Sequence, residues 1–171
     1  MIKNNVMLRK ITIEDTENII KWKNKPEVKK NFCIQEDLTR EVHLNWFKNK
    51  IQTGEVEQFI IIARSTNTPV GSTYLRDIDK KNKKAEFGIF IGENSARNKG
   101  MGTDTTILMA QYGFEKLQLN KVFLRVFSNN LGAIKAYEKA GFEYEGTAKQ
   151  DIRLPDGSYQ DIVFMSKLKG N

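Results

Sequence analysis

Residues 85–102 have the sequence AEFGIFIGENSARNKGMG, and this stretch decides the fold. Its first part, from Ala85 to Gly92, is rich in isoleucine and phenylalanine and predicts a strand. Its second part brings Arg97, Gly100 and Gly102 to the point where helical spacing begins. Glycines leave the backbone N–H groups of a helix start unhindered, which is where a pyrophosphate is best held. The stretch therefore predicts a strand, a phosphate-binding turn and a helix, in that order.

Two glycines interrupt the predicted strand. If its alternation is regular, Glu86, Gly88 and Phe90 share one face and the odd positions form an apolar face. Glycine weakens a strand interior, so Gly88 and Gly92 indicate a β-bulge or a backbone that another group approaches closely. Packing against a neighbouring helix is the structural alternative. A bulge at Gly88 would also change the direction in which Glu86 points.

A second glycine-marked segment begins at Asn130 and ends in Gly141-Phe142. Within it Asn130, Ala133 and Tyr137 fall at positions i, i+3 and i+7, which places them on one face of a helix. Gly141 is a typical C-terminal stop for that helix. Taken alone, Asn130 is explained as an N-cap and Tyr137 as a half-buried core aromatic. Their shared face, together with the first glycine segment, favours an enzyme site.

Strand and helix periodicities alternate along the rest of the chain. Strands are predicted at 6–11, 57–63, 69–77, 85–92, 121–127, 142–153 and 159–168, and helices at 14–24, 39–52, 102–117 and 130–140. Strands 57–63, 69–77 and 85–92 have short links and predict an antiparallel meander. The helix 102–117 between strands 85–92 and 121–127 predicts a crossover that makes these two strands parallel. We expect a mixed α/β fold with about seven strands in one sheet and about four flanking helices.

Composition narrows the class of protein. The length of 171 residues predicts one domain over residues 1–171. The chain has 28 Lys and Arg against 21 Asp and Glu, which gives a net charge of +7. The charges are interleaved, so a nucleic-acid partner is not expected. The longest apolar stretch, 59–63, is too short for a bilayer, and the N-terminus lacks a secretory signal, so we expect a cytoplasmic protein. The single Cys33 cannot form an internal disulfide, and no Cys or His cluster predicts a metal site.

The two glycine segments resemble those of the GCN5-related N-acetyltransferase (GNAT) family. The pattern is R-x-x-G-x-G at 97–102 after a strand, followed by N-x-x-A-x-x-x-Y-x-x-x-G-F at 130–142. The resemblance in element order covers nearly the whole chain. It implies a single-domain GNAT-like fold with a V-shaped sheet, splayed between the strand ending at Gly92 and the strand ending at Phe127, and acetyl-CoA as cosubstrate in the opening. The chain departs from the common form of the family at Asn98, where glycine is frequent.

The resemblance also implies which residues hold the cofactor. They are Ile91, Gly92, Arg97, Asn98, Lys99, Gly100, Met101, Gly102, Thr103 and Asn130. Ile91 and Gly92 would pair with the pantetheine arm like an extra strand, and residues 97–103 would wrap the pyrophosphate. Asn130 would contact the cofactor near the pantetheine, and Tyr137 would face its sulfur.

The chemistry of acetyl transfer assigns roles to Glu86 and Tyr137. An alkyl ammonium is neutral in only about one molecule in ~2,500 at pH 7, so the acceptor must lose a proton before it attacks. A carboxylate is the simplest base, and Glu86 is the candidate; pairing with a lysine on the sheet surface is the structural alternative. Main-chain N–H groups would stabilise the oxyanion. The expelled thiolate benefits from a proton, which the Tyr137 phenol can supply.

The acceptor is less closely defined. The family places acceptor specificity on the first two helices, their linker and the last hairpin, here 22–47 and 151–161. Five side chains there could stack on a base or sugar, although aromatic residues at helical spacing are more often core residues: Trp22, Phe32, His43, Trp46 and Tyr159. We expect a small-molecule primary amine, such as an amino sugar or a polyamine, ahead of a protein N-terminus as in ribosomal-protein acetyltransferases. Two classes without catalysis stay open: an acyl-CoA-binding regulatory module and a basic RNA- or ribosome-associated domain.

Exposed sheet edges favour a homodimer.

Overall fold

One seven-stranded mixed sheet organises the protein. The computed structural model describes residues 5–170. Its strands are β1 (Val6–Lys10), β2 (Glu57–Ala63), β3 (Thr68–Asp79), β4 (Lys84–Ile91), β5 (Lys121–Phe127), β6 (Glu143–Arg153) and β7 (Tyr159–Leu168). Their spatial order is β1-β2-β3-β4-β5-β7-β6, and β4 and β5 are parallel neighbours while the other neighbouring pairs are antiparallel. The predicted meander, crossover and closing hairpin are therefore confirmed.

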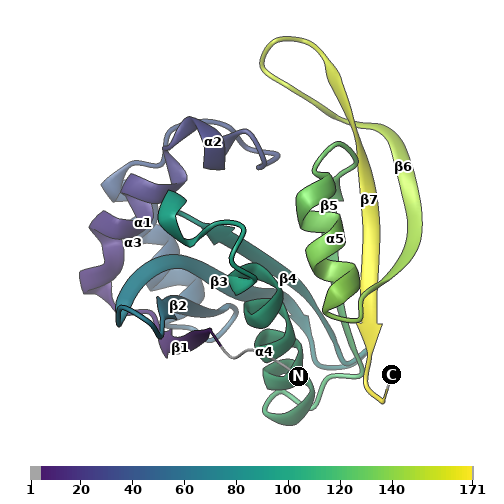
Figure 1. The fold of residues 1–171 in the computed structure, drawn as a ribbon, viewed down its shortest axis with the longest axis horizontal. Coiled ribbons are helices and arrows are strands. Elements are labelled where there is room, and N and C mark those ends of the chain that lie inside the picture. Colours follow the sequence, from purple (N-terminus) through teal and green to yellow (C-terminus); the bar gives the residue numbers. More distant parts are fainter. Residues whose placement is uncertain (1–4, 171) are drawn as a thin grey trace.

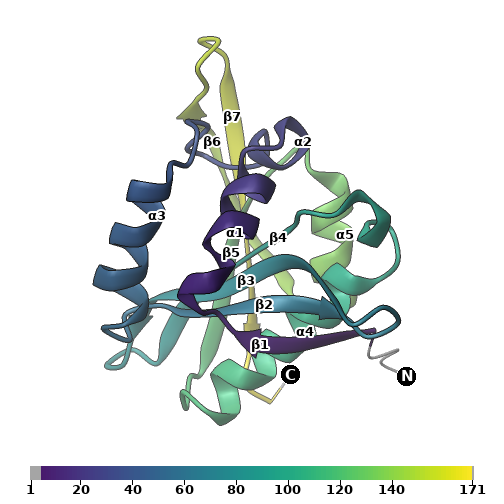
Figure 2. The ribbon, with the colours of Figure 1, turned by 90° about the vertical axis from the view of Figure 1, so that its left-hand side faces the viewer.

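Helices cover both faces of this sheet (Figures 1 and 2). They are α1 (Thr16–Lys23), α2 (Pro26–Lys29), α3 (Arg40–Trp46), α4 (Met101–Glu115) and α5 (Leu131–Lys139). Short 3₁₀ helices lie at Ile13–Asp15 and Asn94–Ala96, and a π-helical segment at Phe47–Ile51 continues α3. On one face, Ile19 and Trp22 of α1 join Ile60, Ile62 and Phe90 of the sheet in an apolar cluster. This cluster forms because the even positions of β2 and β4 point toward α1.

The opposite face packs on α4 and α5. Met109, Ala110 and Phe114 of α4 meet Leu75 and Phe87 of the sheet in the largest apolar cluster. The residues that follow α5 close the same cluster through the buried side chains of Ala140 and Phe142. Val6, Ile61 and Val70 continue this face toward Met101 at the start of α4. The helix that follows the glycine turn is thus anchored by its apolar side, and its N-terminus is fixed relative to β4.

The sequence predictions differ from the structure at two places. The short helix α2 was not among the predicted helices; it begins at Pro26, because proline suits the first position of a helix. The β-bulge at Gly88 was a wrong prediction: β3 and β4 keep a regular register through Tyr74↔Gly88 and Leu75↔Phe87. Gly88 is required because a Cβ there would lie 2.3 Å from Cζ of Tyr74, so the other expectation, a close approach, holds.

Gly92 has a similar explanation from the neighbouring helix. A Cβ at Gly92 would lie 2.0 Å from Cγ of Trp22, whose ring is buried on α1. The structural alternative of helix packing is therefore confirmed for this glycine. Because no bulge intervenes, Glu86 and Phe90 lie on the face of β4 that α1 covers, as the alternation predicts.

Candidate active site

The parallel strands β4 and β5 separate part-way along their length (Figure 1). Their recorded pairing is Lys84↔Lys121, Ala85↔Val122 and Glu86↔Phe123, although β4 continues to Ile91 and β5 to Phe127. Beyond Glu86 the two strands therefore diverge within the described residues. The splayed sheet that the resemblance implied is present, and it leaves one edge of β4 without a partner strand.

The glycine turn lies at the open end of this gap. Gly100 is the N-cap of α4 and has φ +80°, a left-handed conformation that favours glycine. Asn98 also has a positive φ, 59°, which asparagine tolerates better than most residues, so it replaces the common glycine without changing the turn. No atom lies within 4 Å of a Cβ built on Gly102. A side chain at this position would therefore not be crowded, and the first N–H groups of α4, which a helix start leaves without intrahelical acceptors, suit an anion.

Two cations approach the main chain at the end of β4. Arg97 donates from Nη2 to the carbonyl oxygen of Ile91 at 3.1 Å. Lys25 donates from Nζ to the carbonyl oxygen of Gly92 at 2.6 Å. Arg97 belongs to the predicted cofactor residues, whereas Lys25 was not predicted. Both place positive charge beside the turn, which suits a phosphate-bearing ligand.

Tyr137 lies on α5 beside the diverging strands. Its ring makes an edge contact with Phe87 of β4, with centroids 6.1 Å apart, and packs near Phe142. The structure records no hydrogen bond from its hydroxyl to another described residue. Burial raises the pKa of Tyr137 well above its usual range, and the nearby Tyr74 phenol adds to the shift. The phenol is therefore protonated at neutral pH.

Asn130 is the N-cap of α5. Its Oδ1 accepts a hydrogen bond from the Ala133 N–H at 3.3 Å, and its Nδ2 donates to Oδ1 of Asn31 at 3.3 Å. The N-cap explanation is confirmed, and the side chain additionally joins α5 to the segment after α2. Asn130 and Tyr137 lie on the same helix, as their spacing predicts.

Glu86 is buried, with 4% of its surface exposed, and binds two arginines. Arg76 on β3 donates to its carboxylate from Nε at 3.1 Å and from Nη2 at 3.2 Å. Arg125 on β5 does the same from Nε at 3.0 Å and Nη2 at 3.2 Å. We name these three residues the arginine–carboxylate cluster. Burial alone would raise the pKa of Glu86, but the two guanidiniums outweigh it and hold that pKa below its ordinary value.

A polar cavity of about 450 Å³ opens between the segment after α2, the start of α5 and the β6–β7 hairpin. Its lining residues are Glu27, Lys30, Asn31, Gln35, Arg97, Phe127, Asn129, Asn130, Leu154 and Gln160. The cavity thus joins Arg97, which is predicted to bind the cofactor, to both segments that were expected to bind the acceptor. Its volume is within the usual range for small-molecule sites.

A family model described as an acetyltransferase (GNAT) domain matches residues 5–143. The chain belongs to the GNAT family. An N-acetyltransferase of Bacillus licheniformis, p20, is 28% identical over 165 residues, covering 95% of this chain and 92% of its own length. The spermidine N(1)-acetyltransferase of Escherichia coli K12 is 27% identical, covering 95% of this chain and 85% of its own length.

Solved GNAT structures agree with the fold. Spermidine N-acetyltransferase from Vibrio cholerae, in complex with CoA and spermine, superposes with a TM-score of 0.89 at 23% identity and covers 97% of this chain and 96% of its own. A further structure of that enzyme is dodecameric, and another contains manganese ions. This likeness confirms the predicted fold. The acetyltransferase activity of the chain is shown by the GNAT family model and by the relatives named as N-acetyltransferases. Among the described residues, no helix is long and apolar enough to cross a membrane.

Besides Lys25, three residues beside the gap were not predicted from the sequence: Arg76, Arg125 and Tyr74. Arg76 lies directly opposite Glu86 in the β3–β4 register, and Arg125 comes from β5. Tyr74 lies over Gly88, and the Arg76 guanidinium is 5.6 Å from its ring centroid. Gly88 was the signal for Tyr74 in the sequence. A glycine inside a strand indicates that another group approaches the backbone closely, and here that group is the Tyr74 ring. The arginine pairing needs the strand register, which periodicity does not supply.

Most of the aromatic candidates for acceptor binding are structural. Trp22 is fully buried and donates from Nε1 to Glu93 at 2.6 Å, and Phe32 packs on Phe90. Trp46 donates to Gln58. His43 is buried with Nδ1 3.2 Å from the Thr16 hydroxyl, and burial lowers its pKa. The core interpretation of these side chains is therefore the better one, and Tyr159 on the hairpin stays exposed.

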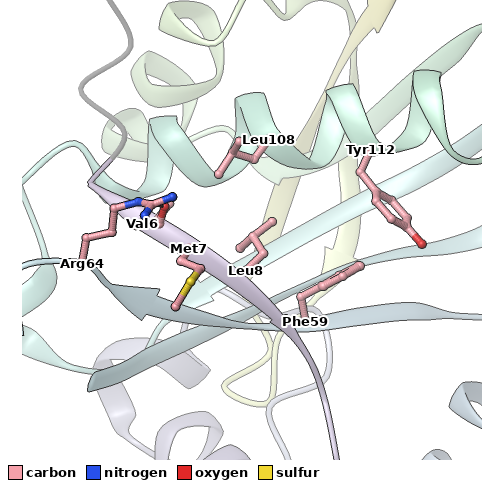
Figure 3. A pocket seen from close by; sticks show the side chains of 7 residues that line it. All are labelled: Val6, Met7, Leu8, Phe59, Arg64, Leu108 and Tyr112. Atoms are coloured by element: carbon pink, nitrogen blue, oxygen red, sulfur yellow. The ribbon is translucent and has the colours of Figure 1, made fainter. Parts of the chain in front are cut away.

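A second cavity lies away from the gap, between β1 and α4 (Figure 3). Its volume is about 300 Å³, and its lining residues are Val6, Met7, Leu8, Phe59, Arg64, Leu108 and Tyr112. None of these described residues belongs to the predicted site. The lining is mainly apolar and lacks a carboxylate, so it offers no base for acetyl transfer.

Proposed function

We propose that this acetyltransferase uses acetyl-CoA to acetylate the primary amine of a small molecule in the gap between β4 and β5. The observation that carries the proposal is the end of strand pairing at Glu86↔Phe123, beside a helix start with unhindered N–H groups. The relatives named as spermidine acetyltransferases support an amine acceptor. The cavity of about 450 Å³ supports a small one.

The residues present fit acetyl-CoA. The turn from Arg97 to Thr103, which includes Lys99, offers backbone donors and two cations for a pyrophosphate. The carbonyl groups of Ile91 and Gly92 already accept bonds from Arg97 and Lys25, but a carbonyl oxygen has two lone pairs and can accept another. The unpaired edge of β4 is thus available to an extended pantetheine arm.

The proposed reaction is direct transfer. The neutral amine attacks the thioester carbonyl, the C–S bond breaks, the nitrogen loses its proton and the leaving sulfur gains one. Tyr137 is the proposed donor of the second proton, since its phenol is protonated and close to Phe87 on β4. A phenol is ordinarily a weaker acid than a thiol by about 1.5 pKa units. The desolvation that raises the pKa of Tyr137 would also raise that of a thiol in the same gap, so the two acids stay comparable.

Glu86 stays the proposed base, and its two arginine partners determine how readily it accepts a proton. Its lowered pKa keeps it ionised at neutral pH, yet a carboxylate that accepts four N–H bonds is a weak proton acceptor. If a water molecule in the site, or bulk water, takes the proton from the amine, Glu86 does not have to accept it directly. The Glu86→Gln variant in the Discussion separates these routes.

An acceptor screen tests the proposal. The protein is mixed with acetyl-CoA and with polyamines, amino sugars, nucleotide-linked amino sugars or N-terminal peptides, and free thiol is measured. We expect thiol release with a small-molecule amine; release with peptides alone would favour protein N-termini instead. Thermal stability with CoA is the companion measurement, because a ligand at 100 times its dissociation constant adds about 2.7 kcal/mol. Stabilisation by CoA without thiol release would indicate a non-catalytic module, and binding to RNA that weakens with salt would indicate the nucleic-acid class.

Location, metal content and assembly complete the proposal. We expect the enzyme in the cytoplasm and active without a metal, which fractionation and a chelator test examine. The open edges of β1 and β6 suit a homodimer, and light scattering measures its mass.

A further inference from the structure

The face of the gap that carries Glu86 has more positive than negative charge. The arginine–carboxylate cluster contains two guanidiniums and one carboxylate. Lys23 of α1 lies on the same face of the sheet, with its ammonium 4.7 Å from the centroid of the Phe32 ring, which packs on Phe90 of β4. Burial lowers the pKa of Lys23, and the positive charge of Arg76 lowers it further. Three cations are thus gathered on the side from which α1 covers the sheet.

The carboxylates near this group do not balance it. Glu86 neutralises one charge, and Asp77 lies 3.9 Å from Nε of Arg76 with 72% of its side chain exposed, so water screens it. Within residues 5–170 the structure records no carboxylate partner for Lys23. Among the carboxylates within 4.0 Å of these cations, only Glu86 and Asp77 are recorded in residues 5–170, so one of the three positive charges has no carboxylate at ion-pair distance. An excess of this kind beside a reaction centre attracts an anion.

The two arginines also have unused donors. Each guanidinium has five N–H groups and donates two of them to Glu86, one from Nε and one from Nη2. Their side chains are 34% and 40% exposed, whereas that of Glu86 is 6% exposed. The carboxylate therefore lies beneath the guanidiniums and fixes their positions, and the remaining N–H groups can reach a ligand.

We propose that the acceptor carries an anionic group, a phosphate or a carboxylate, in addition to its amine, and that Arg76, Arg125 and Lys23 bind it. This inference rests on the proposed function. A fixed pair of guanidiniums suits planar or tetrahedral oxyanions. The cavity agrees, because it has one carboxylate, Glu27, against the cations Lys30 and Arg97.

A polyamine lacks what this surface would bind. Spermidine carries positive charge on every nitrogen at neutral pH, so three gathered cations repel it. A site for spermidine needs carboxylates that are not already paired with arginines. The buried carboxylate here, Glu86, forms ion pairs with both arginines of the cluster. The acceptor of this chain accordingly differs from the one in the names of its spermidine-acetylating relatives.

Matched acceptor pairs test this inference. The pairs are glucosamine with its phosphate ester, and pentylamine with aminopentanoate; spermidine is the polycationic probe. The measured quantity is kcat/KM from thiol release at constant ionic strength. We expect the anionic member of at least one pair to exceed the neutral member about tenfold or more. The two pairs distinguish a phosphate from a carboxylate.

Variants locate the preference. Lys23→Gln and Arg125→Gln should each lower the ratio of kcat/KM between anionic and neutral members about tenfold. The ratio is insensitive to a general loss of active protein, and Lys23→Gln leaves Glu86 paired. Lys116→Gln removes the same charge at the exposed C-terminal end of α4 and should leave the ratio unchanged.

Two results would overturn the inference alone: higher kcat/KM for spermidine or the neutral members, or an unchanged ratio in both variants. Either leaves the proposed acetyltransferase reaction intact. Absence of thiol release with every amine would overturn the proposed function and this inference together.

Discussion

The Glu86→Gln variant separates a proton-accepting role of Glu86 from its part in the arginine–carboxylate cluster. Glutamine keeps the shape of glutamate but loses its charge, and it retains one oxygen to accept N–H bonds. Of the four bonds that Glu86 accepts, those to Oε2 from Arg76 Nε and Arg125 Nη2 are lost or weakened. The variant therefore leaves two guanidiniums close together without a counter-charge.

The expected loss of stability follows from burial. Removing one partner of a fully buried ion pair costs about 3–5 kcal/mol. Here the guanidiniums are 34% and 40% exposed, so water replaces part of the lost interaction. We expect about 2 kcal/mol, which corresponds to a fall in Tm of about 4–8 °C for a domain of this size. Glu55→Gln, which removes an exposed carboxylate paired with Lys50, should cost about 0.5 kcal/mol or less.

The pH dependence gives the sign of the effect. The pKa of Glu86 is lower in the folded protein than its ordinary value of 4.5. The carboxylate therefore stabilises the fold fully above about pH 4.5, and this contribution is lost as the pH falls through the lower folded pKa. Urea unfolding of wild type and variant between pH 3 and 8 measures the difference. A stability difference that is absent at pH 7, or that grows as the pH falls below 4, would contradict the reasoning.

Activity of the same variant decides the catalytic question. If Glu86 is the base, its loss should matter most at neutral pH and less at high pH, where free amine is plentiful. If Glu86 only holds Arg76 and Arg125 in place, kcat/KM should fall by the same factor at every pH. A pH-independent loss would therefore remove the base role, and an unchanged activity would remove both roles.

Three further variants examine other parts of the site. Tyr137→Phe should lower kcat about 100-fold, while CoA should stabilise the variant as much as the wild type. Because the pKa of Tyr137 is raised, the activity of the wild type should not fall with rising pH below about pH 10. Equal kcat in variant and wild type would refute proton donation by Tyr137. Gly88→Ala should cost about 1–3 kcal/mol in urea unfolding, because its Cβ would overlap the Tyr74 ring, and Tyr74→Ala should restore most of that loss. Gly100→Ala should cost about 1–2 kcal/mol and raise KM for acetyl-CoA, because alanine disfavours φ +80°; Gly170→Ala, which shares a positive φ near the C-terminus, should leave that KM unchanged.

The sequence predicted those parts of the site that depend only on residues close together along the chain. The turn at Gly100, the helix start at Met101 and the N-cap at Asn130 all follow from residue types at fixed spacings. The parallel arrangement of β4 and β5 follows from the helix between them. Each of these features depends on the backbone conformation of a few consecutive residues. The types and spacing of those residues are therefore enough to predict it.

Contacts between distant strands could not be predicted in the same way. Glu86 meets Arg76 from β3 and Arg125 from β5, and which side chains meet depends on strand register and on where β4 and β5 diverge. The same holds for Tyr74 over Gly88: the glycine indicated either a β-bulge or a closely approaching group, and only the strand register shows that the Tyr74 ring is that group. Alternation identifies the face on which a residue lies, but the partner comes from a neighbouring strand whose alignment the local pattern leaves open.

The alternation of β4 divides the gap into two chemically different sides. Phe87 points toward α5 and contacts Tyr137, so an uncharged, protonated phenol lies on the face that α4 and α5 cover. Glu86, one residue earlier, points to the opposite face and holds Arg76 and Arg125 there. A thioester in the gap would thus have its proton donor on one side and a charged surface on the other. We infer that the amine enters from the charged side, because an acceptor entering beside Tyr137 would have to displace the apolar cluster around Phe142.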